Sequence, residues 1–451
     1  MRALLATSIG VTCAAALTLP LAAPASSTSD SVAGRASAAH GPASTAAGPS
    51  DGSAASTPAG PAAELPGSTQ SLPLSPLPSA ATRATGSPAR GTVRGLPRSD
   101  ARPFSLVGVV WDDVDTELHG TVQIRTRATG TTHWSDWQNV ETHNSEHAAD
   151  PGSAEGKART VRGSTSPLWV GDSDGVEVRV SPEAPGPQDR AATPVELPGG
   201  LRLELVDPGE DPRQPTAGRA RGATRAGAVI PAATKADSGA EAFLAAGAKP
   251  YIGPRPRIIT RKGWGANEKL RERQFAYTKS VKAAFVHHSA TGNNYSCSQA
   301  PAVLRSIYRY HVQSSGWRDF GYNFAVDKCG NIYEGRAGGV TKAVLGAHTL
   351  GFNTNSMGVA VLGTFTSKNP PAAAVNAIAK LTAWKLGLFG ANPKGKTTLV
   401  SGGGNRYKKG KKVKLNVISG HRDGFATECP GGRLYKKLGT ARTSSARLQG
   451  R

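Results

Sequence analysis

Two histidines and one cysteine in the C-terminal half of the chain have the residue types of a metal site. His287 follows the apolar run 281–286, His421 follows the apolar run 415–419, and Cys429 lies eight residues after His421. Two neutral imidazoles and one thiolate can bind a zinc ion and leave its fourth position for water, which is how a catalytic zinc site differs from a closed structural one. The spacing alone is a weak signal, because histidine and cysteine side chains at strand ends can also be packed and inert.

The other cysteines bear on whether Cys429 is free to bind a metal. Cys297 and Cys329 lie in segments of loop composition, and Cys13 lies in an apolar N-terminal stretch that we expect to be removed. In an exported protein the simplest arrangement pairs Cys297 with Cys329 and leaves Cys429 as a thiolate, which a metal would protect from oxidation. A disulfide between Cys429 and one of the other two is the alternative.

The same region contains four short sequence blocks. They are FVHHSAT at 285–291, WRDFGYNF at 317–324, NSMGV at 355–359, and GHRD at 420–423 followed by TECPG at 427–431. Together they closely resemble the peptidoglycan recognition proteins, a family that includes the phage lysozyme-like, type 2 N-acetylmuramoyl-L-alanine amidases. The resemblance covers residues 250–440, and the layout of the whole chain is similar to long secreted members from high-GC Gram-positive bacteria.

The resemblance implies a set of metal ligands. His287, His421 and Cys429 match the zinc ligands of the family, so Zn²⁺ is the expected cofactor. His288 matches a position that is not a ligand. Because neighbouring residues on a strand point to opposite faces, we expect His288 to be packed or hydrogen-bonded beneath the site.

Three further positions have roles that the resemblance implies. Tyr322 matches the catalytic tyrosine, and a pKa of about 10 suits a donor to the developing oxyanion better than a base. Thr427 stands where phage members have a lysine and animal members a threonine, and we expect its hydroxyl to hold the same oxyanion. His348 matches a histidine near the cleft, where a substrate contact and a structural role both stay open.

The function implied by this resemblance is a secreted, zinc-dependent amidase. It would hydrolyse the amide between N-acetylmuramic acid and L-alanine in peptidoglycan, with zinc polarising the carbonyl and lowering the pKa of its bound water to about 7. The alternative is a non-catalytic recognition protein that binds peptidoglycan. Such members usually lack the cysteine ligand or the tyrosine, and because Cys429 and Tyr322 are both present we favour the enzyme.

Alternating strand and helix patterns around these blocks predict an α/β domain over residues 250–440, with a central sheet flanked by helices. The predicted strands are 281–286, 324–327, 331–334, 357–363 and 415–419, the second and third forming a hairpin, and the predicted helices are 299–314 and a segment that Asn369 would cap. Residues 441–451 would form a basic tail.

A different pattern, with alternating apolar and polar residues, marks residues 102–208. Four strand-like segments predict a β-rich, sandwich-like module or a small barrel, and they are 104–111, 120–127, 176–180 and 201–206. Trp134 and Trp137 in this module could stack on sugars, but packing in the core is the interpretation that we favour. Nothing in the module indicates chemistry.

The N-terminus indicates export. A basic residue, an apolar run and the small-residue sequence APA predict a removable signal peptide over residues 1–25, with a retained membrane anchor as the alternative. Residues 26–97 and 209–249, which are poor in large apolar residues, are predicted to be flexible linkers. We therefore expect a secreted or wall-associated protein with no stable membrane span after signal removal.

The composition of the 451-residue chain favours an anionic partner. Its net charge is +22, its pI is near 10.1, and it contains 54 glycines and 32 prolines. Charge alone does not identify the polyanion, but the sequence has no RNA-binding or recognition-helix motif. Peptidoglycan and anionic wall polymers are therefore the expected partners, and nucleic acid is not. The basic run 406–414 is either a wall-binding patch or a solvated hairpin tip.

Overall fold

The computed structural model describes residues 67–78, 92–142, 144–158, 160–183, 196–211, 227–246 and 251–451. The predicted signal peptide and most of the first predicted linker lie outside these ranges. Within them, no helix combines the length and the apolar character needed to cross a membrane.

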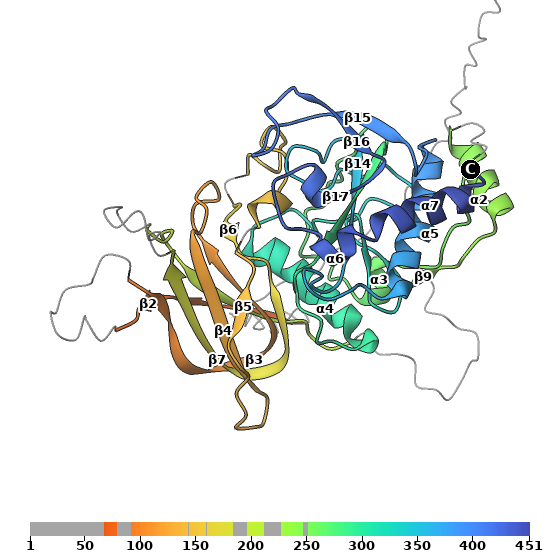
Figure 1. The fold of residues 1–451 in the computed structure, drawn as a ribbon. Coiled ribbons are helices and arrows are strands. Elements are labelled where there is room, and N and C mark those ends of the chain that lie inside the picture. The colour runs from red at the N-terminus through yellow and green to blue at the C-terminus, as the bar shows by residue number, and fades with distance from the viewer. Residues whose placement is uncertain are drawn as a thin grey trace, which may run out of the picture. The chain divides into compact units, whose positions relative to one another are not determined.

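An antiparallel sheet forms the N-terminal module, in the order β1-β8-β3-β7-β4-β5, with β2 and β6 paired to β3 (Figure 1). Its elements are β1 (Ser68–Pro73), β2 (Ser75–Pro76), β3 (Arg94–Trp111), β4 (Gly120–Ala128), β5 (Gln138–Val140), η1 (Ser145–His147), β6 (Gly163–Ser164), β7 (Leu168–Pro182) and β8 (Arg202–Asp207). The β-rich prediction is confirmed: the predicted strands 104–111, 120–127 and 176–180 lie within β3, β4 and β7, and 201–206 overlaps β8.

The apolar run at the end of β3 is buried on both faces. Phe104, Val107 and Val109 pack in the core of the N-terminal module. Leu106 and Val110, on the opposite face, belong to an apolar cluster shared with the C-terminal domain. The continuous apolar sequence of this strand therefore reflects two interfaces, one on each face.

A mostly parallel sheet forms the centre of the C-terminal domain, in the order β17-β11-β14-β12-β13-β10-β9. Its strands are β9 (Val229–Ile230), β10 (Ile258–Ile259), β11 (Ala283–His288), β12 (Phe324–Val326), β13 (Ile332–Glu334), β14 (Ser356–Val361) and β17 (Ile418–Gly420), and a separate hairpin joins β15 (Lys396–Val400) to β16 (Lys412–Asn416). The helical segments are α2 (Lys235–Ala246), α3 (Arg261–Trp264), η2 (Cys297–Gln299), α4 (Ala300–Arg309), η3 (Tyr310–Ser314), α5 (Ala372–Leu388), η4 (His421–Asp423), α6 (Gly432–Tyr435) and α7 (Leu438–Gln449).

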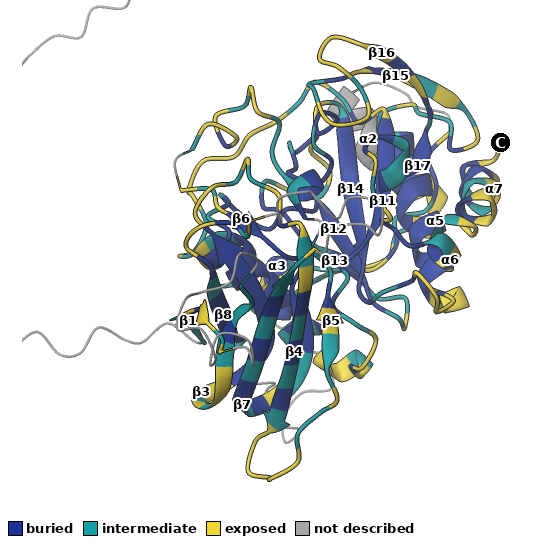
Figure 2. Cartoon of the chain, turned by 60° about the vertical axis from the view of Figure 1, so that its left-hand side comes forward, coloured by how far each residue is buried: buried dark blue, intermediate teal, exposed yellow. Residues whose placement is uncertain are grey.

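Helices cover both faces of this sheet, as predicted. Val286 and Val359 point to the face covered by α5 and α7, whereas Ala325 and Ala360 point to the face covered by α4. The central strands β11, β12 and β14 are buried along their whole length, which Figure 2 shows in dark blue. The predicted α/β domain is confirmed.

Two predicted linkers contain regular structure. The strands β1 and β2 and the start of β3 lie within residues 26–97, and β9 and α2 lie within residues 209–249. β1 is an edge strand whose backbone pairs with β8, while most of its side chains are polar and at least partly exposed. Such a strand is stabilised mainly by backbone pairing, so its composition resembles that of a linker.

The predicted basic tail over residues 441–451 is wrong, because α7 continues through most of it and packs on α5. Ala441 is buried, Ser445 Oγ lies 3.1 Å from Thr382 Oγ1, and Gln449 donates to the carbonyl of Ala383 at 3.0 Å. Small and polar side chains make much of this contact, so the sequence lacks the large apolar stripe of a packed helix.

Two local boundaries also differ from the prediction. Pro371, not Asn369, is the N-cap residue of α5. The predicted strand 415–419 is divided, because β16 ends at Asn416 in the hairpin with β15 and β17 begins at Ile418 beside β11.

Trp134 and Trp137 do not enter the core, contrary to the favoured interpretation. Both are partly exposed, and arginine side chains cover their rings. The guanidinium carbon of Arg98 lies 5.2 Å from the ring centroid of Trp134, and those of Arg125 and Arg179 lie 4.8 and 4.2 Å from that of Trp137. Cation–π contacts and the arginine stems take the place of apolar packing here.

Candidate metal centre

Parallel strand pairing brings the two predicted histidine ligands together. β11 pairs in parallel with β17, Val286 lying opposite Gly420, so the residues that follow these two lie side by side near the carboxyl ends of the strands. These residues are His287 and His421, whose ring centroids are 4.5 Å apart. Both side chains are fully buried.

Cys429 completes the predicted set. Its Sγ lies 3.8 Å from His287 Nδ1, and its side chain is buried. A fourth residue that was not predicted, His147, joins the group, and the ligand atoms of all four lie within 4.8 Å of one another. Zinc bonds of about 2.0–2.3 Å place the ligands of one ion within about 4 Å of one another, so small side-chain shifts would suffice.

The chemistry of these donors fits a soft or borderline cation. Both ring nitrogens of His421 and of His147 are buried without a hydrogen-bond partner within the described residues. Burial, together with the neighbouring histidines, holds the pKa of His287 and of His421 well below 6.5, so the imidazoles are neutral and present lone pairs. Burial also raises the pKa of Cys429, which a bound cation would reverse. Imidazole nitrogen and thiolate sulfur are the ligands typical of zinc.

A hydrogen-bonded chain stands behind His287. Its Nε2 lies 3.4 Å from Thr349 Oγ1, which in turn lies 3.0 Å from His348 Nδ1. His348 is fully buried. The structure therefore places His348 behind a candidate ligand, where it can orient His287 through Thr349.

His288 points away from the cluster, to the opposite face of β11 from His287. It is buried, and its Nδ1 accepts a hydrogen bond from the backbone N–H of Phe365 at 3.3 Å. His288 is thus packed and hydrogen-bonded, as expected for a residue beneath the site.

Tyr322 lies beside the cluster, two residues before β12. Its ring centroid is 5.2 Å from that of His287 and 5.9 Å from that of His147. Burial raises its pKa well above 10, with further contributions from Cys429 and Glu146, so the phenol retains its proton. A protonated phenol at this position can donate a hydrogen bond to a charge that develops nearby.

Thr427 lies at the rim of the same group. Its hydroxyl accepts from the backbone N–H of Cys429 at 3.1 Å and donates to Glu146 Oε1 at 2.8 Å. The hydroxyl that we expected to be available to an oxyanion therefore has a carboxylate partner in this structure.

Comparisons with known proteins agree with the sequence blocks. Residues 277–432 match the family described as N-acetylmuramoyl-L-alanine amidase. Peptidoglycan-recognition protein SC2 of Drosophila melanogaster is 29% identical over 185 residues, which are 41% of this chain and 85% of that protein. The C-terminal domain belongs to this amidase and peptidoglycan recognition protein family.

Further members extend the comparison of the amidase domain. Human N-acetylmuramoyl-L-alanine amidase is 32% identical over 203 residues, which are 44% of this chain and 29% of that protein. Among solved structures, Drosophila PGRP-LB is 26% identical with a TM-score of 0.32, and peptidoglycan recognition protein LE in complex with tracheal cytotoxin is 30% identical with the same TM-score; each match covers 41% of this chain and 92% of the other.

The N-terminal module matches a different family. Residues 56–198 match the family described as Rv3811 N-terminal galactose-binding domain-like. His147 and Glu146 lie in this match, on η1, and not in the amidase match. Sequence reasoning missed both, because no spacing or motif relates η1 to segments that follow it by more than a hundred residues.

The disulfide of the amidase domain joins Cys297 and Cys329, as in the simplest predicted arrangement. Their Cα atoms are 6.2 Å apart, and Cys429 is free. The bridge ties η2 to the turn between β12 and β13. The alternative pairing of Cys429 with either residue is therefore wrong.

Proposed function

We propose that the amidase domain is a zinc-dependent N-acetylmuramoyl-L-alanine amidase that cleaves the amide between N-acetylmuramic acid and L-alanine in peptidoglycan. The observation that supports this most directly is the convergence of His287, His421 and Cys429 at one sheet edge, with their ligand atoms within 4.8 Å. The family match adds the substrate class, because relatives of the amidase domain are named for this activity and for peptidoglycan recognition.

A zinc ion held by these residues would supply a Lewis acid for the amide carbonyl and a water of lowered pKa. The chain's own residues prepare the site for that chemistry. His287 is held by Thr349, and burial keeps its imidazole neutral. Tyr322 keeps its proton, so it is a donor for the oxyanion that forms when the carbonyl is attacked. Thr427 is a second donor once its hydroxyl is released from Glu146.

A recognition protein without catalysis is the second candidate function. Relatives named as peptidoglycan-recognition proteins favour it. The presence of both residues beside two histidines favours catalysis, because a binding protein requires neither a thiolate ligand nor a buried donor. We therefore place the enzyme first.

Secretion and wall association are part of the same proposal. The disulfide between Cys297 and Cys329 is typical of proteins that fold in an oxidising compartment. The loop between β15 and β16 carries exposed basic residues, among them Lys408, Lys409 and Lys411. Such a surface attracts anionic wall polymers in a salt-dependent way.

Product analysis tests the proposal. The full-length, zinc-loaded protein is incubated at length with purified peptidoglycan, and new N-terminal alanine and new reducing ends are counted. We expect alanine termini without reducing ends, loss of the activity after chelation, and recovery on addition of zinc. New reducing ends, or cleavage that survives chelation, would contradict the amidase. Binding to peptidoglycan with no cleavage in any variant would support the recognition protein.

A further inference from the structure

Residues 144–158 of the N-terminal module, here called the plug, lie across the amidase centre. The plug begins at Asn144, before η1, and contributes Glu146 and His147 to the site. The backbone carbonyl of Glu146 accepts from the N–H of Leu350 at 2.9 Å, and its carboxylate accepts from Thr427. The ring centroid of His147 lies 4.5 Å from that of His421 and 5.3 Å from that of His287.

Two more carboxylates fasten the plug farther from the metal ligands. Asp150 accepts from the backbone N–H of Gly351 and from the side-chain amide of Asn353, both at 2.8 Å. Glu155 forms a two-pronged ion pair with Arg336, at 2.7 and 2.9 Å. Glu155 and Arg336 are less than a tenth exposed, so this pair is buried between the plug and the amidase domain.

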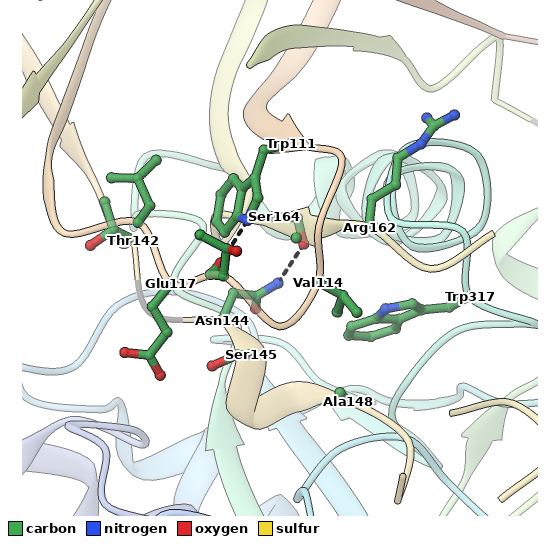
Figure 3. A pocket seen from close by; sticks show the side chains of 13 residues that line it. Trp111, Val114, Glu117, Thr142, Asn144, Ser145, Ala148, Arg162, Ser164 and Trp317 are labelled. Atoms are coloured by element: carbon green, nitrogen blue, oxygen red, sulfur yellow. Dashed lines mark hydrogen bonds between the residues drawn. The ribbon is translucent and has the colours of Figure 1, made fainter. Parts of the chain in front are cut away.

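Hollows flank the plug on several sides. One of about 290 Å³ is bounded by residues 149–155 and by Leu345 and Asn353 of the amidase domain, and a second of about 140 Å³ lies on the other side of Glu155, beside Phe275. A third hollow adjoins the base of the plug, where Asn144 donates to Ser164 Oγ beneath Trp111 (Figure 3). Residues of the plug thus line all three hollows.

The plug closes the centre to any large substrate. His287 and His421 have no exposed surface, and a glycan strand with a stem peptide has no path to them while the plug is in place. His147 would also bring the number of protein ligands of a bound zinc ion from three to four. Four protein ligands are typical of a closed structural zinc site, whereas a catalytic site keeps one position open.

We propose that the plug holds the amidase in a latent form, with His147 as a fourth, displaceable metal ligand. This inference rests on the proposed zinc site. Activation is a local opening of the plug that removes His147 from the metal, frees the Thr427 hydroxyl from Glu146, and joins the flanking hollows into one groove for the glycopeptide.

The experiment compares three full-length proteins, wild type, His147→Ala and the control His133→Ala, which changes an exposed histidine of the same module. Each is loaded with Co²⁺ for visible absorption and with Zn²⁺ for X-ray absorption. We expect wild type and His133→Ala to show three imidazole ligands and one sulfur, and His147→Ala to show two imidazoles, one sulfur and a water oxygen, with an altered Co²⁺ spectrum. Identical spectra for wild type and His147→Ala would overturn the proposal.

Two further measurements follow the opening itself. We expect a soluble muramyl peptide to bind His147→Ala at least about tenfold more tightly than wild type, because apparent affinity scales with the fraction of open sites. Cleavage of peptidoglycan should rise by a similar factor. The variant Asp150→Ala removes no ligand and should shift binding in the same direction, which covers the case in which His147→Ala does not fold.

The outcomes separate the two proposals. Altered coordination and tighter binding without cleavage in any variant would support the plug and refute the amidase. Equal binding of the muramyl peptide by wild type, His147→Ala and Asp150→Ala would refute the plug, whatever the cleavage products are.

Discussion

The ion pair between Glu155 and Arg336 provides a quantitative test of how firmly the plug is closed. Burial by itself would raise the pKa of Glu155, but the guanidinium of Arg336 and the backbone N–H of Arg318 outweigh it, so the pKa lies below its ordinary value. The carboxylate is therefore charged at neutral pH. The substitution Glu155→Gln preserves the shape of the side chain and one oxygen acceptor while removing the charge.

The substitution leaves the Arg336 guanidinium buried without a charged partner, and this sets the expected loss of stability of the closed plug. Removing one partner of a buried ion pair costs about 3–5 kcal/mol, and we expect about 3 kcal/mol because glutamine still accepts a hydrogen bond. Lifting the plug returns Arg336 to water, so the cost falls on the closed state and not on the fold as a whole. At about 1.4 kcal/mol per factor of ten, the open fraction rises about 100-fold.

Amide hydrogen exchange measures this change at two defined positions. The N–H groups of Leu350 and Gly351 donate to Glu146 and Asp150 of the plug, so both exchange through plug opening. The N–H of Phe352 donates to Thr349 within the same loop and serves as the internal control. We expect about 100-fold faster exchange at the first two positions and little change at the third.

The control for Glu155→Gln is a second charge-removing substitution in the same module. Glu177→Gln removes the charge of a more exposed ion pair with Arg125 in the same module, where we expect a change of at most about 1 kcal/mol in stability and none in exchange at Leu350. If Glu155→Gln lowers global stability while exchange at Leu350 and Gly351 stays at the wild-type rate, the plug does not open as a local unit.

Three further results are expected. Cys429→Ala should bind zinc more weakly than wild type, measured by competition with a chelator, because the thiolate is removed and only the three histidines of the cluster remain, while circular dichroism shows an unchanged fold. Tyr322→Phe should keep its zinc and lose about 100-fold in cleavage rate, assayed where the wild-type rate is measurable, because one oxyanion donor is removed. Burial lowers the pKa of Lys385 to about 7 although its amine donates to the carbonyls of Val340 and Lys342. In the unfolded chain the Lys385 amine binds a proton up to about pH 10.4, so between about pH 7 and pH 10 the unfolded state binds more protons than the folded one. The free energy of unfolding should therefore fall by about 1.4 kcal/mol per pH unit as the pH drops from about 10 to about 7. Chemical denaturation of the wild type and of Lys385→Met measures this difference.

The parts of the site that could be predicted from the sequence lie at the ends of buried strands. His287 follows an apolar run in β11 and His421 follows β17, and parallel pairing places such residues at one edge of a sheet. The hairpin of β12 and β13 and the amphipathic α4 have equally local patterns. Each of these predictions depends on interactions between residues close in sequence or on the strand order of a recognised family.

The parts that could not be predicted depend on contacts between distant segments. His147 has no periodic pattern or motif around it, and its role is set by how the N-terminal module packs on the amidase domain. β1 was assigned to a linker because backbone pairing with β8 stabilises it and does not require apolar side chains. α7 was assigned to a tail because alanine and serine allow close helix packing without large apolar residues.

The way in which the N-terminal module docks restricts how the site can open. Leu106 and Val110 of β3 share one apolar cluster with Tyr310, whose hydroxyl also donates to the carbonyl of Thr165 in the module at 3.0 Å. Separating the whole module would expose that cluster to water at about 25 cal/mol per Å² of apolar surface.

The plug itself is fastened by carboxylates, which can exchange protein partners for water at a much smaller net cost. Pro151, Gly152 and Lys157, near the tip of the plug, are exposed while Glu155 between them is buried. In the proposed latent amidase, an activating molecule would reach the tip and compete for Arg336 without disturbing the contact between β3 and α4. Opening confined to residues 144–158 is thus the least costly way to move His147 away from His287, His421 and Cys429.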